Sequence, residues 1–189
     1  MIDRQQEHVL LQLAEASIRH GLAHGRPLKP DLVEYEPALR EPGASFVTLK
    51  REGELRGCIG SLTAHRPLVD DVAENAYAAA FSDPRFYPLQ AIELHGLEMH
   101  VSILGTPEPM GFTSERDLLE QLRPGIDGLI LEEGFRRGTF LPSVWEQLPS
   151  AQDFLNHLKL KAGLPVNYWS ETIQISRYTT HSFSTTIKA

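Results

Sequence analysis

The first part of the chain has apolar residues at the three- and four-residue spacing of an amphipathic helix. Between residues 4 and 22 this stripe comprises Leu10, Leu11, Ala14, Ile18 and Leu22. The spacing predicts a helix with one apolar face, which Gly21 or Gly25 would end. His20 and His24 are four residues apart, so they would share a helix face only if the helix continues past Gly21. We do not expect this pair to bind a metal.

The pattern changes to a period of two between residues 45 and 62, which predicts a β-hairpin. Ser45 to Arg51 is the first predicted strand, and Glu52-Gly53-Glu54 is its turn. The chain from Leu55 onwards is the returning strand. Successive side chains of a strand point to opposite faces. We therefore expect Leu55 and Ile59 to face a core.

The same alternation places Arg56 and Cys58 together on the other face of the returning strand. Gly57 and Gly60 lie beside them and leave gaps where another backbone or a ligand can approach closely. The returning strand is therefore a candidate wall of a binding or reaction site.

A second amphipathic helix is predicted from Leu68 to Ser82, after Pro67, which suits a first helical turn. Its apolar side comprises Leu68, Val72, Ala76, Ala79 and Ala80, and its polar side comprises Asp70, Asp71 and Glu74. The acidic first turn complements the positive N-terminal end of the helix dipole.

The remaining pattern alternates short strands and short helices. We expect strands over residues 92–104, 125–132, 136–141 and 171–178, and helices over residues 115–122, from 142, and over 150–163. Ser114 and Ser150 are the expected N-caps of two of these helices. Trp145 and Phe154 stand at helical spacing from other apolar residues, which predicts that both belong to a core. The tail from Thr179 is polar but holds Phe183 and Ile187.

This order of elements predicts an α+β fold with a mainly antiparallel sheet and packed helices, because hairpins and isolated helices replace a repeating strand–helix pattern. With 189 residues the chain has the length of a single domain, residues 1–189. An N-terminal helix within residues 1–24 precedes a proline-rich connection, and residues 45–178 form the main body.

The formal net charge of −7 argues against a broad nucleic-acid-binding surface, which needs an excess of Lys and Arg. The chain has one cysteine, so it can form neither an internal disulfide nor a zinc site built on thiolates. It has no apolar run of signal-peptide or membrane-spanning length. These features predict a soluble cytoplasmic protein without direct nucleic-acid or membrane partners.

Cys58 is the candidate catalytic residue, because a cation beside a thiol favours the nucleophilic thiolate. Arg56 would tune the thiol or bind an anionic substrate, and His65 would act as a base from the following loop. The alternative for Cys58 is a structural role, because free cysteine is often buried as a small hydrophobe. The alternative for His65 is a solvated loop histidine.

The turn after the second helix contributes the remaining candidate residues. Asp83, Arg85 and Phe86 would reach the same site as the substrate-binding residues Arg56, Gly57 and Gly60. The alternative for Asp83 and Arg85 is an ion pair that stabilises the turn. We find no sequence motif for a nucleotide, a cofactor or a metal.

Several blocks of the sequence resemble the AMMECR-one-like domain family, whose bacterial and archaeal members are called AmmeMemoRadiSam system protein A. The first block is Leu-Arg-Gly-Cys-Ile-Gly at residues 55–60, and the others lie at residues 71–86, 93–104 and 140–164. The resemblance covers roughly residues 5–180 and matches the blocks in order.

The resemblance implies an α+β domain of two unequal lobes with a cleft between them. It also implies an association with a Memo-type protein and a radical SAM protein, but no established reaction. Two functions follow: a thiol-dependent enzyme or modification component acting in the cleft through Cys58 and Arg56, or a non-catalytic accessory protein that binds a ligand or partner. Neither requires a cofactor, and the sequence leaves the oligomeric state open.

Overall fold

The computed structural model describes residues 2–188 and divides the chain into two compact units. The larger unit comprises Met1–Leu104 with His181–Ala189, and the smaller comprises Gly105–Thr180. Each unit has a hydrophobic core of its own. The strand pairs whose register is known are antiparallel, and the helices are not interleaved with parallel strands. The predicted α+β class is therefore confirmed.

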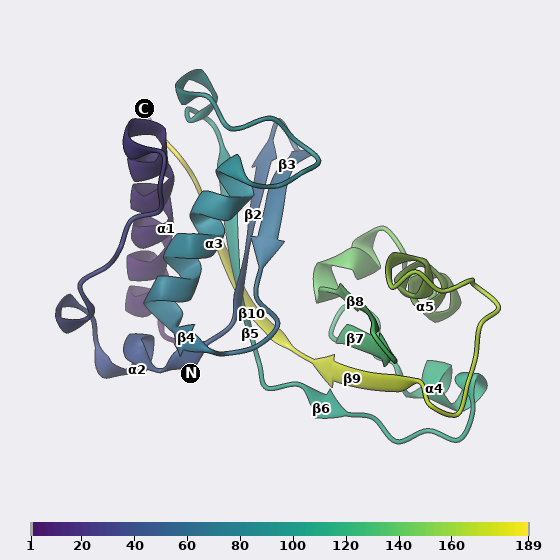
Figure 1. The fold of residues 1–189 in the computed structure, drawn as a ribbon. Helices are drawn as coiled ribbons and strands as arrows, with labels where there is room; N and C mark the ends of the chain where they lie inside the picture. Colours follow the sequence, from purple (N-terminus) through teal and green to yellow (C-terminus); the bar gives the residue numbers. More distant parts are fainter. Residues whose placement is uncertain (1, 189) are drawn as a thin grey trace. The chain divides into compact units, whose positions relative to one another are not determined.

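The larger unit is built on a four-stranded sheet in the order β10-β5-β2-β3. Its strands are β2 (Ser45–Arg51), β3 (Glu54–Gly60), β5 (Glu98–Leu104) and β10 (Thr180–Thr186). The helices α1 (Arg4–His24) and α3 (Leu68–Phe81) pack against each other, and α3 packs against β2 and β3 (Figure 1). Short elements complete this unit: η1 (Leu32–Glu34), α2 (Pro37–Arg40), the paired β1 (Pro42–Gly43) and β4 (Arg66–Pro67), and η2 (Ala91–Glu93).

Helix α1 begins at a capping box in which the Asp3 side chain accepts from the backbone of Gln6, and the Gln6 side chain accepts from Asp3. The helix continues through Gly21 and ends at Gly25, whose φ of 69° is the left-handed conformation that glycine adopts readily. Because the helix does not stop at Gly21, the rings of His20 and His24 stack at 4.2 Å between centroids.

The predicted hairpin is confirmed, but the prediction that Leu55 faces the core is wrong. The pairing register shifts between Leu49 and Lys50: Leu49 lies opposite Gly57 and Lys50 lies opposite Leu55. Arg56 is therefore the extra residue of a β-bulge, which interrupts the simple alternation of faces. Leu55, on the turn side of the bulge, is 39% exposed, whereas Ile59 packs against the core as expected.

Helix α3 buries the predicted apolar stripe, but the prediction that Asp71 lies on the exposed side is wrong. Asp71 is completely buried together with Asn75, four residues further along the helix. Both flank the apolar stripe, so the sheet that covers the stripe also covers them. Their polar groups are satisfied by hydrogen bonds inside the unit.

The smaller unit holds a four-stranded sheet in the order β6-β9-β7-β8. Its elements are β6 (Glu108–Pro109), α4 (Glu115–Gln121), β7 (Gly128–Glu133), β8 (Arg136–Phe140), η3 (Pro142–Glu146), α5 (Ala151–Lys161) and β9 (Gln174–Tyr178). Ser114 and Ser150 cap α4 and α5 as predicted. Trp145 and Phe154 are buried and stack at 3.8 Å between ring centroids, which confirms their core role.

The sequence pattern did not predict β10, which forms from the polar tail. Its alternating sequence leaves Phe183 half-buried against the larger core, and Ile187, just after the strand, is buried in the same core. Pairing with β5 satisfies the backbone hydrogen-bonding groups of this segment, and its polar side chains give no sequence signal of that pairing. The C-terminal tail thus returns to the unit that contains the N-terminal helix (Figure 1).

Candidate functional site

Cys58 lies on β3, which is an edge strand of the larger sheet. It is partly exposed and pairs across the sheet with Thr48 on β2. The backbone N–H of Cys58 points away from β2, so the two residues form a non-hydrogen-bonded pair, in which side chains come close. The Cys58 Sγ is 3.2 Å from the Thr48 Oγ1. The thiol therefore has a hydroxyl as its immediate polar neighbour.

Asp83 and Arg85 cover the outward backbone groups of Cys58. The Cys58 N–H donates to Asp83 Oδ2 at 2.9 Å, and Arg85 Nη2 lies 3.4 Å from the Cys58 carbonyl oxygen. The same Asp83 Oδ2 accepts a hydrogen bond from Arg85 Nη2 at 2.7 Å. An edge strand has unpaired N–H and C=O groups, so this pair of side chains takes the place of a further strand.

The ion pair changes the acid–base properties of both partners. Hydrogen bonds from the Arg85 side chain lower the pKa of Asp83 from 3.8 to about 2, and the Cys58 N–H adds to this effect. The pKa of Arg85 is raised, chiefly by Asp83 and to a small extent by the nearby Cys58. Arg85 is thus a cation in electrostatic contact with Cys58.

Arg56 is occupied by Glu93 from η2. Its Nε and Nη2 donate to the two carboxylate oxygens of Glu93 at 2.8 and 3.0 Å, and Arg51 approaches the same carboxylate at 3.6 Å. The hydrogen bonds from Arg56 lower the pKa of Glu93. Arg56 Nη1 is buried and has no hydrogen-bond partner within residues 2–188. Within residues 2–188, no hydrogen bond or ion pair joins Arg56 to the Cys58 thiol, which it was predicted to tune.

A pocket of about 380 Å³ lies beside these residues. Both guanidiniums flank the ring of Phe86, with Arg85 Cζ at 5.4 Å and Arg56 Cζ at 6.0 Å from the ring centroid. Tyr87 is 90% exposed. The lining comprises Arg56, Arg85, Phe86, Tyr87, Pro88, Gln90 and Glu93. Three predicted site residues, Arg56, Arg85 and Phe86, thus line the pocket, and Asp83 is hydrogen-bonded to one of them, Arg85.

The other five predicted site residues do not line this pocket: Cys58 and Asp83, described above, and His65, Gly57 and Gly60. His65 is exposed and its Nδ1 is 2.9 Å from the Thr63 carbonyl oxygen, and no hydrogen bond joins it to Cys58 in the described part of the chain. A Cβ at Gly57 would lie 2.0 Å from the carbonyl oxygen of Ala79, and one at Gly60 would lie 2.2 Å from the Phe46 ring. The space beside Gly57 is therefore filled by the backbone of α3, and the space beside Gly60 by the Phe46 ring, both of the same unit.

A buried polar cluster at the other end of β3 was not anticipated. The Asp71 carboxylate accepts hydrogen bonds from the backbone and hydroxyl of Ser45, from Ser61, from Arg66 and from Asn75, at distances of 2.7 to 2.9 Å. The i, i+4 spacing of Asp71 and Asn75, beside an apolar stripe, was the signal that could have revealed it. Every lone pair of the carboxylate is used, so this cluster fastens β2 and β3 to α3.

The described residues contain no group of three or more His, Cys, Asp or Glu side chains that could hold a metal ion. Within residues 2–188, every helix is too short or too polar to cross a membrane.

Comparison with known proteins places this geometry in a family. The AMMECR1 family model matches residues 11–183. A protein of Methanothermobacter thermautotrophicus is 38% identical over 170 residues, covering 87% of this chain and 85% of that protein. A protein of Thermotoga maritima is 36% identical over 179 residues, covering 94% and 98%.

Among solved structures, the crystal structure of an uncharacterised protein from Pyrococcus horikoshii is 33% identical and has a TM-score of 0.91. The match covers 97% of this chain and 93% of that chain. Both units of the fold are therefore shared with that protein. The extent of the sequence match and the shared fold together show that this chain belongs to the AMMECR1 family.

Proposed function

We propose that this protein is a binding module for an anionic ligand, which it holds in the pocket lined by Arg56, Arg85 and Phe86 without acting on it chemically. The observation that carries this proposal is the pair of guanidiniums over one aromatic ring at a pocket of about 380 Å³. A cavity of this size, with an apolar surface and a few oriented polar groups, is typical of small-ligand sites.

The local charge favours an anion although the chain as a whole is acidic. Arg51, Arg56 and Arg85 stand against the two carboxylates of Glu93 and Asp83 in the linked ion pairs. A positive patch on a protein of net charge −7 concentrates anions locally. The Arg85 side chain is 54% exposed, so it can give hydrogen bonds to a ligand while it keeps its bond to Asp83.

The test uses phenyl phosphate as the probe, because it has one anionic group and one ring. Isothermal titration calorimetry should detect binding of phenyl phosphate and none of benzylamine, which presents the opposite charge. Arg85→Met should weaken binding by about tenfold or more, since hydrogen bonds to charged groups contribute about 1.5–3 kcal/mol. Arg116→Met, at an exposed arginine of the smaller unit, is the control and should leave binding unchanged. Equal binding by both Met variants would refute the proposal.

A second function, a thiol-dependent reaction at Cys58, is favoured by one observation. Asp83 Oδ2 accepts from both the Cys58 N–H and Arg85 Nη2, so it fixes the cation beside the strand that bears the thiol. In this function Cys58 is the nucleophile, His65 is the candidate base, and Arg85 takes the role that the sequence suggested for Arg56.

Alkylation separates the two functions, and Cys58 is the only cysteine, so labelling is unambiguous. If the thiol works with Arg85, anionic iodoacetate should react faster relative to neutral iodoacetamide than it does with a free thiol. Arg85→Met should abolish this preference, and His65→Ala should slow both reagents if His65 is the base. Resistance to both reagents until the protein unfolds would exclude the reaction and leave the binding function intact.

The proposal includes the associations that the family resemblance implies, with a Memo-type protein and a radical SAM protein, and a cytoplasmic location. A single free cysteine supports a reducing compartment. Co-purification of the two proteins with the wild-type chain, and its loss with Arg85→Met, would identify the pocket as the contact. Retention by the Arg85→Met variant would place the contact elsewhere.

A further inference from the structure

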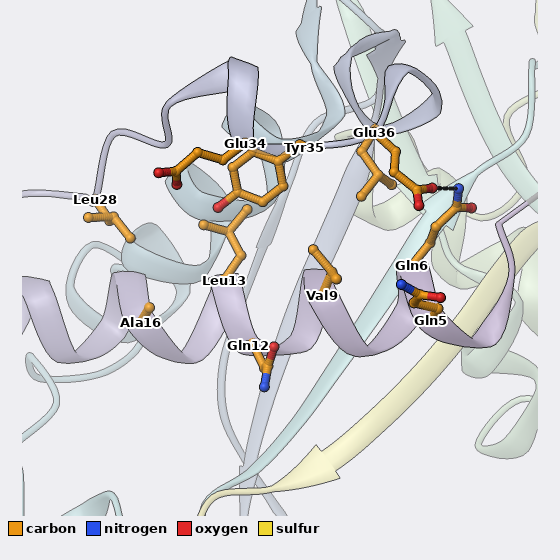
Figure 2. A pocket seen from close by; sticks show the side chains of 11 residues that line it. Gln5, Gln6, Val9, Gln12, Leu13, Ala16, Leu28, Glu34, Tyr35 and Glu36 are labelled. Carbon is orange, nitrogen blue, oxygen red and sulfur yellow. Dashed lines mark hydrogen bonds between the residues drawn. The ribbon is translucent and has the colours of Figure 1, made fainter.

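A second pocket, separate from the arginine pocket, lies along α1. It has a volume of about 450 Å³ and is enclosed by one face of α1, by Leu28 and by the segment from Glu34 to Leu39 (Figure 2). Figure 2 shows Val9 and Leu13 pointing from α1 towards the Tyr35 ring, with Glu34 and Glu36 on either side of that ring. None of its lining residues belongs to the site around Cys58.

The floor of the pocket is apolar. Leu13 and Leu39 are buried at 3% and 1% exposure, and Val9, Leu28 and Tyr35 are half-buried against the core of the larger unit. This surface suits an aliphatic stem of a few carbons, which can lie on apolar side chains while its polar end stays near the rim.

The rim of the pocket carries two carboxylates, Glu34 and Glu36, and within residues 2–188 neither forms an ion pair with a Lys or Arg side chain. Gln6 Nε2 donates to Glu36 Oε2 at 2.7 Å, and Gln6 is itself held by the capping box at Asp3. Glu34 has no hydrogen bond or ion pair from its side chain in the described residues. The lining contains no Lys or Arg, and the nearby Arg40 donates to the backbone carbonyl of Tyr35 at 2.6 Å. One carboxylate is thus fixed and the other is open.

Tyr35 adds a ring whose face attracts cations. Burial and the neighbouring Glu34 raise the pKa of the Tyr35 hydroxyl, so the phenol stays neutral at physiological pH. A cation over this ring gains a cation–π contact, and it gains charge-assisted hydrogen bonds to the open carboxylate of Glu34 on one side, while Glu36, on the other side and bonded to Gln6, adds negative charge (Figure 2).

We infer that this pocket binds an organic cation, an alkyl guanidinium or ammonium group whose stem lies on Val9 and Leu13 and whose charge meets Glu34 beside the Tyr35 ring. The ligand chemistry is opposite to that of the arginine pocket, so the two sites do not compete. The cationic group belongs either to a small molecule or to an arginine or lysine side chain of a partner.

The experiment titrates the full chain with n-butylguanidine and follows amide shifts by NMR, with 1-butanol as the uncharged probe of similar length. Glu34→Gln should weaken butylguanidine binding by about tenfold, since it removes a charge-assisted hydrogen bond, and Glu36→Gln should weaken it by a smaller factor, since it removes only nearby negative charge. Glu36→Gln retains an oxygen for Gln6, so the helix cap is preserved. Glu171→Gln, at an exposed position in the smaller unit, changes the net charge equally and should leave binding unchanged.

The peptide acetyl-Gly-Arg-Gly-amide distinguishes the sources. Tighter binding of this peptide than of butylguanidine assigns the pocket to a partner's side chain, and the reverse assigns it to a small molecule. Both results support the inference if the two Gln variants weaken binding. Equal binding of 1-butanol, unchanged binding in both variants whose thermal unfolding matches the wild type, or no saturable binding at millimolar concentrations would overturn it.

Discussion

Replacing Asp83 with Asn removes the charge that holds Arg85 against the edge strand, and it leaves an oxygen that can still accept the Cys58 N–H. Asp83 is only 5% exposed, so water replaces little of the lost interaction. The variant therefore isolates the ion pair from the backbone hydrogen bond. We expect the folded structure to persist with a lower free energy of unfolding.

The magnitude follows from the pKa of Asp83, which is lowered from 3.8 to about 2. Each pKa unit corresponds to about 1.4 kcal/mol of differential stabilisation of the charged form. Because the Arg85 side chain is 54% exposed and partly screened by water, we expect a loss of about 2 kcal/mol at pH 7. This is a large fraction of the stability of an ordinary domain.

The same reasoning fixes the pH dependence. The pKa of Asp83 is lower in the folded protein than in the unfolded chain, so its contribution is present above pH 4 and is lost as the pH falls towards about 2. Urea unfolding of the wild type and the Asp83→Asn variant at pH 7, 4 and 3 measures the difference directly. The difference should shrink to roughly half its neutral value at pH 3.

The control is Glu171→Gln, which removes an exposed carboxylate of the smaller unit and should change the free energy of unfolding by less than about 0.5 kcal/mol. A difference for Asp83→Asn that is the same at pH 7 and pH 3 would show that the lost interaction is not the ionised pair. A loss below about 0.5 kcal/mol at pH 7 would refute the view that Asp83 and Arg85 stabilise the edge of the sheet.

Two further substitutions test the cores and the close packing of the hairpin. Phe154→Ala should lower the free energy of unfolding of the smaller unit by about 3–5 kcal/mol in urea titrations, because Phe154 is fully buried, whereas Phe135→Ala, at a 95% exposed ring, should cost about 0.5 kcal/mol or less. A small effect at both positions would contradict the assignment of Phe154 to the core. Gly57→Ala should cost about 2 kcal/mol or more in thermal or urea unfolding, because the new Cβ would lie 2.0 Å from the carbonyl oxygen of Ala79. Gly111→Ala, where a Cβ meets nothing within 4 Å, is the matched control, and equal stability of the two variants would contradict the close approach.

The sequence alone determined the fold class, most element positions and much of the core. The period-two pattern of residues 45–60 and the capping signals at Ser114 and Ser150 depend on neighbouring residues, so they can be recognised without tertiary structure. The paired strands and both caps are present in the structure. The proximity of Cys58 to residues 83–86 was also expected, because these residues follow the end of the helix predicted after the strand.

Only the tertiary structure decided which cation contacts Cys58. A one-residue bulge at Arg56 interrupts the alternation of side chains along β3. The Arg56 guanidinium, which the alternation placed on the same face as Cys58, is hydrogen-bonded to Glu93, 37 positions away in sequence. Arg85 lies beside the Cys58 backbone instead, because Asp83 accepts from both Arg85 and the backbone of β3.

The same holds for the elements that cooperate over long distances. The buried Asp71 is stabilised by Ser45, 26 positions away, and β10 forms because β5 offers it an edge. Periodicity reports which face of an element is apolar, but it does not report which distant polar group will meet a buried carboxylate or a free strand edge. Those pairings depend on how the chain closes on itself, and for this protein they define both the site around Cys58 and the edges of its sheet.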